Sequence, residues 1–273
     1  MYRFLLKPGW IALHIGALFL AILFTNFGLW QLRRLDQRQA RNTLLQERIF
    51  EEPRALTDLL NDFNVIAAPS DSVSVAYRPA TVQGSYDPDY EVLLRSTQNY
   101  EGEPGYYLLT PLKLENGSAI LVNRGWVPFK FEVPPVEAAT PPNGKVEVMG
   151  IVNLERPPPT GPLASLAPRD PPGELEITAY IDTERLEEQM PYDLLPVYLE
   201  LREQSPSQAE GNLPLPLQEP EFTPGSHLGY AVQWFAFTII GVIGYGILLR
   251  QQIRQRREVE NQTNKEARYL EEN

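Results

Sequence analysis

The chain has 273 residues, with 24 lysines and arginines against 35 aspartates and glutamates, and a formal net charge of −11. It contains no cysteine and only two histidines, which excludes disulfides, thiol redox chemistry, thiolate metal sites and a histidine-rich metal cluster. The mean hydropathy of −0.28 is that of a soluble acidic protein, yet the apolar residues are concentrated near the two ends. This uneven distribution predicts membrane-spanning segments in an otherwise acidic chain.

Two uncharged segments, residues 10–30 and 229–249, are each long enough to cross a membrane as a helix. About 20 apolar residues at 1.5 Å rise cover a bilayer core of roughly 30 Å. Trp30, Tyr230 and Trp234 lie at or near the outer ends, where aromatic rings favour the interface. A cleaved signal peptide is the alternative for the first segment, but its apolar run is long and bulky residues follow it, which favours an uncleaved anchor.

The charges around the two spans predict that both termini are cytoplasmic. Residues 31–226 carry 16 basic and 30 acidic side chains, whereas the tail 250–273 begins with a cluster of four arginines. Cytoplasmic flanks are enriched in Lys and Arg, so the tail is placed inside and the two spans return the N-terminus to the same side. Four arginines just after residue 30 point the other way, but long loops are translocated largely regardless of charge. The predicted order is a cytoplasmic segment 1–9, a span 10–30, an extracytoplasmic domain 31–226, a span 227–249 and a cytoplasmic tail 250–273.

The first membrane helix is predicted to continue as a helical extension through residues 31–50. Proline and glycine are absent from residues 32–49, where good helix formers dominate. Arg34, Arg41 and Arg48 recur every seven residues and form one stripe. The stripe is either a solvated face or a surface that meets anionic lipid headgroups, carboxylates or an acidic partner.

The rest of the domain, from about residue 75 to 203, is predicted to be β-rich. A short helix is expected at 56–63, and strands are expected at 77–86, 91–95, 145–153, 176–181 and 196–202. Proline-rich stretches at 134–143, 156–173 and 203–225 predict loops. The predicted fold class is therefore an α+β membrane protein, in which two transmembrane helices flank one β-rich extramembrane domain with antiparallel hairpins.

Asn116-Gly117, between two alternating apolar runs, predicts a hairpin with a two-residue turn. Such a turn pairs Leu112 with Leu121. It also places on one face of the second strand the side chains of Ile120, Val122, Arg124 and Trp126. The pair Arg124 and Trp126 then predicts a cation–π contact, and the alternative is a structural role in which Arg124 binds carbonyls or a carboxylate.

No catalytic constellation is found: the chain lacks a glycine-rich phosphate loop, a G-x-S-x-G elbow and a His-x-x-x-His pair. The sequence therefore predicts no catalytic residue, no metal site and no enzyme activity, and the open alternative is a membrane-tethered hydrolase, which would need a clustered carboxylate site. The acidic domain also argues against nucleic-acid binding, which needs a basic surface.

The two histidines are the remaining candidates for cofactor chemistry. His227 begins the second span, where a neutral imidazole could ligate haem iron with Tyr230 and Trp234 as flat apolar contacts. The alternative is a polar residue that bonds a neighbouring loop at the helix start. His14 lies about four residues inside the first span from the cytoplasmic end, roughly 24 Å from Trp30 along a helix, so the two histidines cannot share one haem.

Four sequence blocks resemble the surfeit-locus (Surf/Shy) family of cytochrome c oxidase assembly factors. In order, they are Gly28-Leu29-Trp30-Gln31-Leu32-x-Arg34, Gly105-Tyr106-Tyr107-Leu108-Leu109-Thr110-Pro111-Leu112, Val122-Asn123-Arg124-Gly125-Trp126-Val127-Pro128 and His227-Leu228-Gly229-Tyr230-Ala231-Val232-Gln233-Trp234-Phe235. Their order and spacing extend the resemblance over nearly the whole chain.

The resemblance implies a non-enzymatic factor that assists haem a insertion or retention in the core oxidase subunit. It implies His227 as the haem ligand, haem a as the cofactor, and the core subunit, haem a synthase and membrane lipids as partners. Its motif residues Trp30, Arg34, Asn123, Arg124, Gly125 and Trp126 are assigned to partner contact or to the fold. The alternative is a membrane-anchored scaffold or interaction protein without a cofactor. The N-terminus has no amphipathic presequence, which favours a bacterial plasma (inner) membrane.

Overall fold

The computed structural model describes residues 2–66, 69–95, 100, 102–162, 164–208, 213–220 and 222–271. By its internal contacts the chain forms two compact units. One unit combines Met1–Thr43 with Phe222–Asn273, and the other comprises Leu44–Glu221. The first unit is helical and the second is β-rich.

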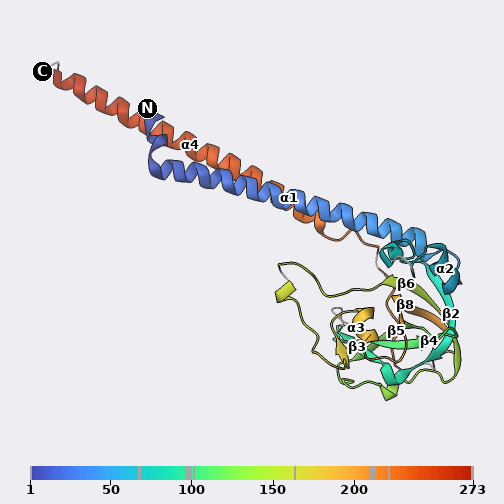
Figure 1. Cartoon of the computed structure of the whole chain (residues 1–273). Coiled ribbons are helices and arrows are strands. Elements are labelled where there is room, and N and C mark those ends of the chain that lie inside the picture. The colour runs from blue at the N-terminus through green and yellow to red at the C-terminus, as the bar shows by residue number, and fades with distance from the viewer. Residues whose placement is uncertain are drawn as a thin grey trace. The chain divides into compact units, whose positions relative to one another are not determined.

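The helical unit contains two long antiparallel helices, which lie side by side in Figure 1. A short 3-10 helix, η1 (Tyr2–Leu6), precedes α1 (Pro8–Ile49), whose last turn belongs to the second unit, and α4 (His227–Glu271) is near the end of the chain. Both helices are long and apolar enough to cross a membrane, by length and composition. They fit a membrane protein, as the sequence predicts.

The two long helices are packed together by aromatic rings. The ring of Trp234 on α4 lies 4.9 Å from that of Phe27 and 5.5 Å from that of Phe24, both on α1. At Gly28 the helices approach so closely that an added β-carbon would lie 2.6 Å from the ring of Phe235. Glycine at this position therefore allows the close helix contact.

The β-rich unit is built on an eight-stranded sheet with the order β1-β2-β6-β8-β5-β4-β3-β7. The strands are β1 (Arg54–Ala55), β2 (Pro79–Tyr86), β3 (Val92–Arg95), β4 (Gly105–Lys113), β5 (Ala119–Pro128), β6 (Lys145–Leu154), β7 (Ile177–Thr178) and β8 (Leu194–Ser205). An additional antiparallel pairing of β2 with β4 joins Ser85 to Lys113 and Tyr86 to Leu112. This pairing closes β2, β6, β8, β5 and β4 into a barrel, while β1, β3 and β7 extend the sheet outside the ring.

The barrel interior is filled by aliphatic side chains that alternate along the strands. Along β2 and β6, the buried side chains of Ala80, Val82, Val146 and Val148 alternate with more exposed neighbours. The short helix α2 (Leu56–Asp62) adds three buried leucines to the same core. This two-residue period is what the sequence pattern predicts for strands with one buried face.

The remaining helices are short and lie within the β-rich unit. They are η2 (Pro69–Ser74), η3 (Pro88–Tyr90), η4 (Glu137–Ala139), η5 (Ala164–Leu166) and α3 (Thr183–Glu187). The carboxylate of Asp182 caps α3 by accepting a hydrogen bond from the backbone N–H of Arg185. The sequence analysis did not predict α3, because only five residues form it.

The hairpin of β4 and β5 is formed, but its predicted turn is wrong by one residue. Leu112 pairs with Ile120 rather than Leu121, so the loop has three residues, Glu115 to Gly117. Of these, Gly117 has a left-handed backbone with φ of +89°. Three-residue hairpin loops commonly end on such a glycine, which explains why the Asn-Gly signal is also compatible with this longer loop.

A β-bulge in β5 also changes the predicted faces. Leu109 pairs with Asn123 and Leu108 with Gly125, so Arg124 is an extra residue without a partner on β4. Directly paired residues share a face, and Trp126 pairs with Tyr107, on the face opposite Ile120 and Val122. The prediction that Trp126 shares a face with Ile120, Val122 and Arg124 is therefore wrong. The predicted fold class, with two apolar helices flanking a β-rich domain, is confirmed.

Candidate functional site

His227 is the first residue of α4 and is half-buried. Its Nδ1 lies 2.9 Å from Oε1 of Gln31 on α1. An amide oxygen can only accept a hydrogen bond, so this contact is a hydrogen bond in the tautomer that carries its proton on Nδ1, and in that tautomer Nε2 has a lone pair. Nε2 has no hydrogen-bond partner within the part of the chain that the structure describes. In the Nδ1–H tautomer His227 would thus present an unprotonated nitrogen, Nε2, at the start of the helix.

The chain segment before His227 is held along α1 by two polar side chains. The backbone carbonyl of Thr223 accepts hydrogen bonds from Arg38 Nε at 2.9 Å and from Asn42 Nδ2 at 3.1 Å. On the other side of His227, Trp234 packs against α1 through its contact with Phe27. These contacts fix the register of α4 against α1 around His227.

The other predicted residues at this end of the helices have different surroundings. Tyr230 and Trp30 are about half exposed, at 50% and 49%. Trp234 contributes its ring to the aromatic packing between the helices. Arg34 is exposed, and its Nη1 donates a hydrogen bond of 3.2 Å to Gln37 Oε1. The structure thus brings His227 together with Gln31, while Tyr230 and Trp30 remain accessible at the helix surface.

His14 differs from His227 because both of its ring nitrogens have partners. Nδ1 contacts the hydroxyl of Tyr245 on α4, and Nε2 lies 3.2 Å from the backbone carbonyl of Leu5. The ring also lies 6.1 Å from that of Trp10. His14 therefore links η1, α1 and α4, and has no free nitrogen in this arrangement.

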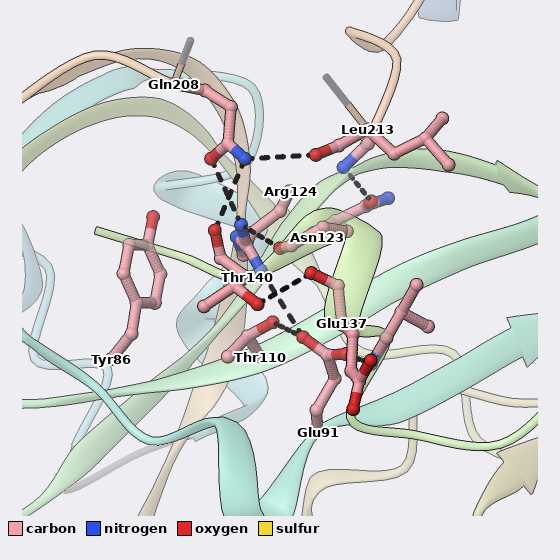
Figure 2. Close-up of polar contacts among 12 residues, drawn as sticks. Tyr86, Glu91, Thr110, Asn123, Arg124, Glu137, Thr140, Gln208 and Leu213 are labelled. Carbon is pink, nitrogen blue, oxygen red and sulfur yellow. Dashed lines mark hydrogen bonds and ion pairs between the residues drawn. The ribbon is translucent and has the colours of Figure 1, made fainter. Parts of the chain in front are cut away.

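A second polar cluster lies in the β-rich unit, around Arg124 (Figure 2). The guanidinium Nη1 of Arg124 lies 3.3 Å from Glu91 Oε2, and both side chains are only 1% exposed. Nη2 donates to the backbone carbonyl of Ala139 at 2.7 Å. The guanidinium also lies 5.2 Å from the ring centroid of Tyr86, so the cation–π partner is Tyr86 and the predicted contact with Trp126 is not formed.

The carboxylate of Glu91 has further donors within the cluster. The hydroxyl of Thr110 donates to Oε2 at 2.7 Å, and the backbone N–H of Val136 donates to Oε1 at 2.9 Å. Arg124 and Glu91 together join the residue before β3, the strands β4 and β5, and the proline-rich loop around η4. The arrangement matches the structural role considered for Arg124, in which it binds a carbonyl and a carboxylate.

Burial dominates the electrostatics of this cluster. Loss of solvent raises the pKa of Glu91, although its hydrogen bonds from Val136 and Thr110 and the charge of Arg124 act in the opposite direction. Burial likewise lowers the pKa of Arg124 and raises that of Tyr86. Each charged member of the cluster therefore depends on the others to remain ionised out of water.

The neighbours of Arg124 serve the bulge and the packing around it. The side-chain oxygen of Asn123 accepts a hydrogen bond of 3.3 Å from the backbone N–H of Gly125. Gly125 has φ of +138°, and an added β-carbon would overlap the backbone oxygen of Leu215. Trp126 is 3% exposed and stacks on Tyr100, with ring centroids 5.2 Å apart.

Both clusters lie within one family match, because a model of the SURF1 family covers residues 18–239. The chain belongs to the SURF1 family. A SURF1-like protein of Mycobacterium bovis is 30% identical over 258 residues, which cover 93% of this chain and 88% of the relative. A SURF1-like protein of Rickettsia felis is 23% identical over 231 residues, or 84% and 92% of the two chains. Surfeit locus protein 1 of Rattus norvegicus is 30% identical over 146 residues, or 48% and 45% of the two chains.

Membership of the SURF1 family confirms the resemblance inferred from the four sequence blocks. Two residues that the structure makes prominent were not singled out as site residues from sequence. Gln31 lies inside the first block, next to Trp30, but nothing local indicates that it meets a residue 196 positions away. Glu91 is one of 35 acidic residues, and only the closed barrel shows that it is buried beside Arg124.

Proposed function

We propose that this SURF1-family protein is a non-catalytic, membrane-anchored assembly factor of cytochrome c oxidase. It assists the insertion or retention of haem a in the core subunit, and His227 is the residue that ligates the haem. The core oxidase subunit and haem a synthase are the protein partners of this proposal. Family membership supports the assembly role, and the free Nε2 of His227 supports the haem role.

The donor set at the helix junction fits a haem better than a bare metal ion. Nε2 of His227 offers one imidazole ligand, and no group of three or more metal-ligating side chains occurs among the described residues. A haem needs only one or two axial ligands from protein, because its ring supplies the other four. When bound, haem a would supply the redox-active iron that the oxidase requires. The chain's own part is to offer the imidazole, and the exposed rings of Trp30 and Tyr230 are the apolar surface close to it along the helices.

The proposed topology places both termini in the cytoplasm and the β-rich domain outside a bacterial plasma membrane. The basic cluster that begins at Arg250 is the main support for this orientation. The apolar surfaces of α1 and α4 are exposed over the two spans, as expected for lipid contact. The orientation can be measured by the accessibility of single cysteines, since the chain has none of its own.

Anionic lipids are the proposed partners of the arginines that follow the first span. Arg33 and Arg34 lie three and four residues beyond Trp30, which places them about 4.5–6 Å further along the helix. Each headgroup layer is roughly 5–7 Å thick, so both guanidinium groups reach it. Arg33→Gln/Arg34→Gln should weaken binding to phosphatidylglycerol nanodiscs, whereas Arg41→Gln, further from the membrane, should not. Equal binding by all variants would contradict this part of the proposal.

The haem role is tested by the spectrum of the full-length protein purified from cells that make haem a. The wild type should contain haem a, and His227→Ala should lose it. His14→Ala is the matched control and should retain haem, because both nitrogens of His14 have other partners. Haem in His227→Ala at the wild-type level, or no haem in any sample, would refute direct ligation by His227.

The assembly role is tested separately by deletion of the gene. The deletion strain should contain less haem a in its oxidase and show lower oxidase activity. Normal holo-oxidase in that strain would refute the assembly role. A scaffold without cofactor is the competing function, and it predicts that His227→Ala restores the deletion strain as well as the wild type does.

A further inference from the structure

Gln31 and His227 form one of the polar contacts between α1 and α4, in addition to the contact of His14 with Tyr245. The two residues are 196 positions apart, and both are half-buried. The contact of 2.9 Å joins the amide oxygen of Gln31 to Nδ1 of His227. A neutral imidazole has one proton and two nitrogens, so an acceptor placed at one nitrogen favours the tautomer in which that nitrogen carries the proton.

We propose that Gln31 is the positioning residue that holds His227 as the Nδ1–H tautomer, with Nε2 free to act as an iron ligand. The second half of this statement rests on the proposed haem role, but the first half does not. In free histidine the proton lies more often on Nε2, which would block that nitrogen as a ligand. The amide oxygen of Gln31 favours the opposite tautomer because it accepts a hydrogen bond only from a protonated Nδ1.

Metal-ligating histidines usually donate their second ring N–H to a carboxylate, a carbonyl or water. That partner fixes the orientation of the ring and the tautomer, and it makes the ligating nitrogen more basic. Gln31 has the corresponding geometry, because it is an acceptor at the nitrogen that does not ligate. In this proposal the contact with Gln31 does more than pack the two helices, because it leaves Nε2 of His227 unprotonated and able to bind a ligand.

The surrounding contacts keep Gln31 opposite His227. The hydrogen bonds of Arg38 and Asn42 to the carbonyl of Thr223 hold the segment before α4. One turn before Gln31 on α1, the ring of Phe235 packs so closely on Gly28 that an added β-carbon there would lie 2.6 Å from it, which is a second contact that depends on the register of the two helices. The imidazole therefore meets Gln31 in a register that is fixed on both sides.

The tautomer can be measured directly by nitrogen-15 NMR of the full-length protein in detergent micelles. With histidine labelled, only His14 and His227 contribute, and His14→Ala assigns the two. Wild-type His227 should show a protonated Nδ1 and an unprotonated Nε2.

Three variants separate the roles of Gln31. Gln31→Leu removes the acceptor and should shift the major population of His227 to the Nε2–H tautomer. Gln31→Glu keeps an acceptor and should retain the Nδ1–H tautomer. Gln37→Leu is the matched control, because Gln37 is an exposed glutamine of the same helix that binds only Arg34 among the contacts described, and it should change nothing at His227.

A second readout is the affinity for ferric haem a, measured by titration of the Soret band. Loss of a residue that supports a metal ligand typically weakens binding by about 10- to 100-fold, so Gln31→Leu should show a loss of this size and Gln31→Glu should not. An unchanged tautomer in Gln31→Leu would overturn the positioning role. A changed tautomer together with haem affinity that is insensitive to His227→Ala would retain the positioning role and refute haem ligation by His227.

Discussion

Replacement of Arg124 by methionine should destabilise the β-rich unit more than an ordinary core substitution does. Methionine fills much of the volume of the arginine stem but leaves Glu91, which is 1% exposed, as a buried carboxylate without its cation. Breaking a buried ion pair in this way typically costs about 3–5 kcal/mol. The carbonyl of Ala139 also loses its donor. Arg124→Met should therefore lower the free energy of unfolding by about 4 kcal/mol.

A second substitution at Glu91 should restore part of this loss. In Arg124→Met/Glu91→Gln both charges are gone, and the glutamine oxygen can still accept the hydrogen bond from the backbone N–H of Val136. The hydroxyl of Thr110 can turn to accept a bond from the glutamine amide. The remaining cost is the unsatisfied carbonyl of Ala139, about 1–3 kcal/mol. The double variant should thus be more stable than Arg124→Met by about 2 kcal/mol.

The assay is urea unfolding of the full-length chain in detergent, followed by the fluorescence of Trp126. Trp126 is buried in the β-rich unit, and the three other tryptophans lie in the long helices. In the reference protein phenylalanine replaces these three tryptophans, which are Trp10, Trp30 and Trp234. If the double variant proves less stable than Arg124→Met, the isolated charge is not the main cost, and the argument from the buried ion pair is refuted.

Three further changes have expected outcomes in the same unfolding assay. Burial raises the pKa of Glu91, so the contribution of this carboxyl group to stability is fully present below its ordinary pKa of 4.5 and is lost as the pH rises through the raised value. The free energy of unfolding of the wild type, relative to that of Glu91→Gln, should therefore fall from pH 4 to pH 7. A rise over this range would contradict the sign of the pKa shift. Gly125→Ala should cost about 2 kcal/mol or more, because φ is +138° and the methyl group would overlap the oxygen of Leu215; an unchanged urea midpoint would refute it. Gly117→Ala should cost only about 1 kcal/mol, because φ is +89° but the β-carbon enters open space, and a loss as large as that of Gly125→Ala would count against the three-residue loop.

The fold was predictable from sequence where the signal is periodic. Uncharged runs of about 20 residues give the spans, and alternation of apolar residues gives the strands of the barrel. Pairing between distant strands has no such local signal. The contacts of β2 with β4 and of β5 with β8 close the barrel, and neither follows from the order of strands along the chain.

The register and faces of β5 could not be obtained from alternation alone. Asn116-Gly117 is compatible with a turn of two or of three residues, and one residue of difference moves every pairing. The bulge at Arg124 then reverses the alternation, so that Trp126 faces away from Ile120. A bulge depends on the tertiary contacts of its extra residue. Here the extra residue is Arg124 and its partner is the buried Glu91, a contact that a local sequence pattern does not contain.

The sequence singles out His227 as a candidate residue, and its role stays a prediction, but the sequence does not indicate its contact with Gln31. A polar residue at the start of an apolar span is visible in the sequence, and its role as a ligand followed from the family resemblance. Gln31 and His227 lie on different helices, so only the packing of α1 against α4 brings them together. The structure also separates the two histidines, since His14 uses both ring nitrogens within the helix pair.

The motif from Asn123 to Trp126 is the most specific of the four blocks, yet each of its residues has a structural explanation. Asn123 bonds the bulge backbone, Arg124 compensates the buried Glu91, and Gly125 has a positive φ beside another backbone. Trp126 is buried against Tyr100. These contacts are of the kind that stabilise a fold, so we expect loss of these residues to lower the amount of folded protein. At the helix junction, by contrast, no hydrogen bond to Nε2 of His227 is formed within the described part of the chain, and this atom is the one for which we propose a ligand role. We therefore expect substitutions of His227 and Gln31 to impair oxidase assembly without lowering the amount of folded protein, and substitutions between Asn123 and Trp126 to lower that amount.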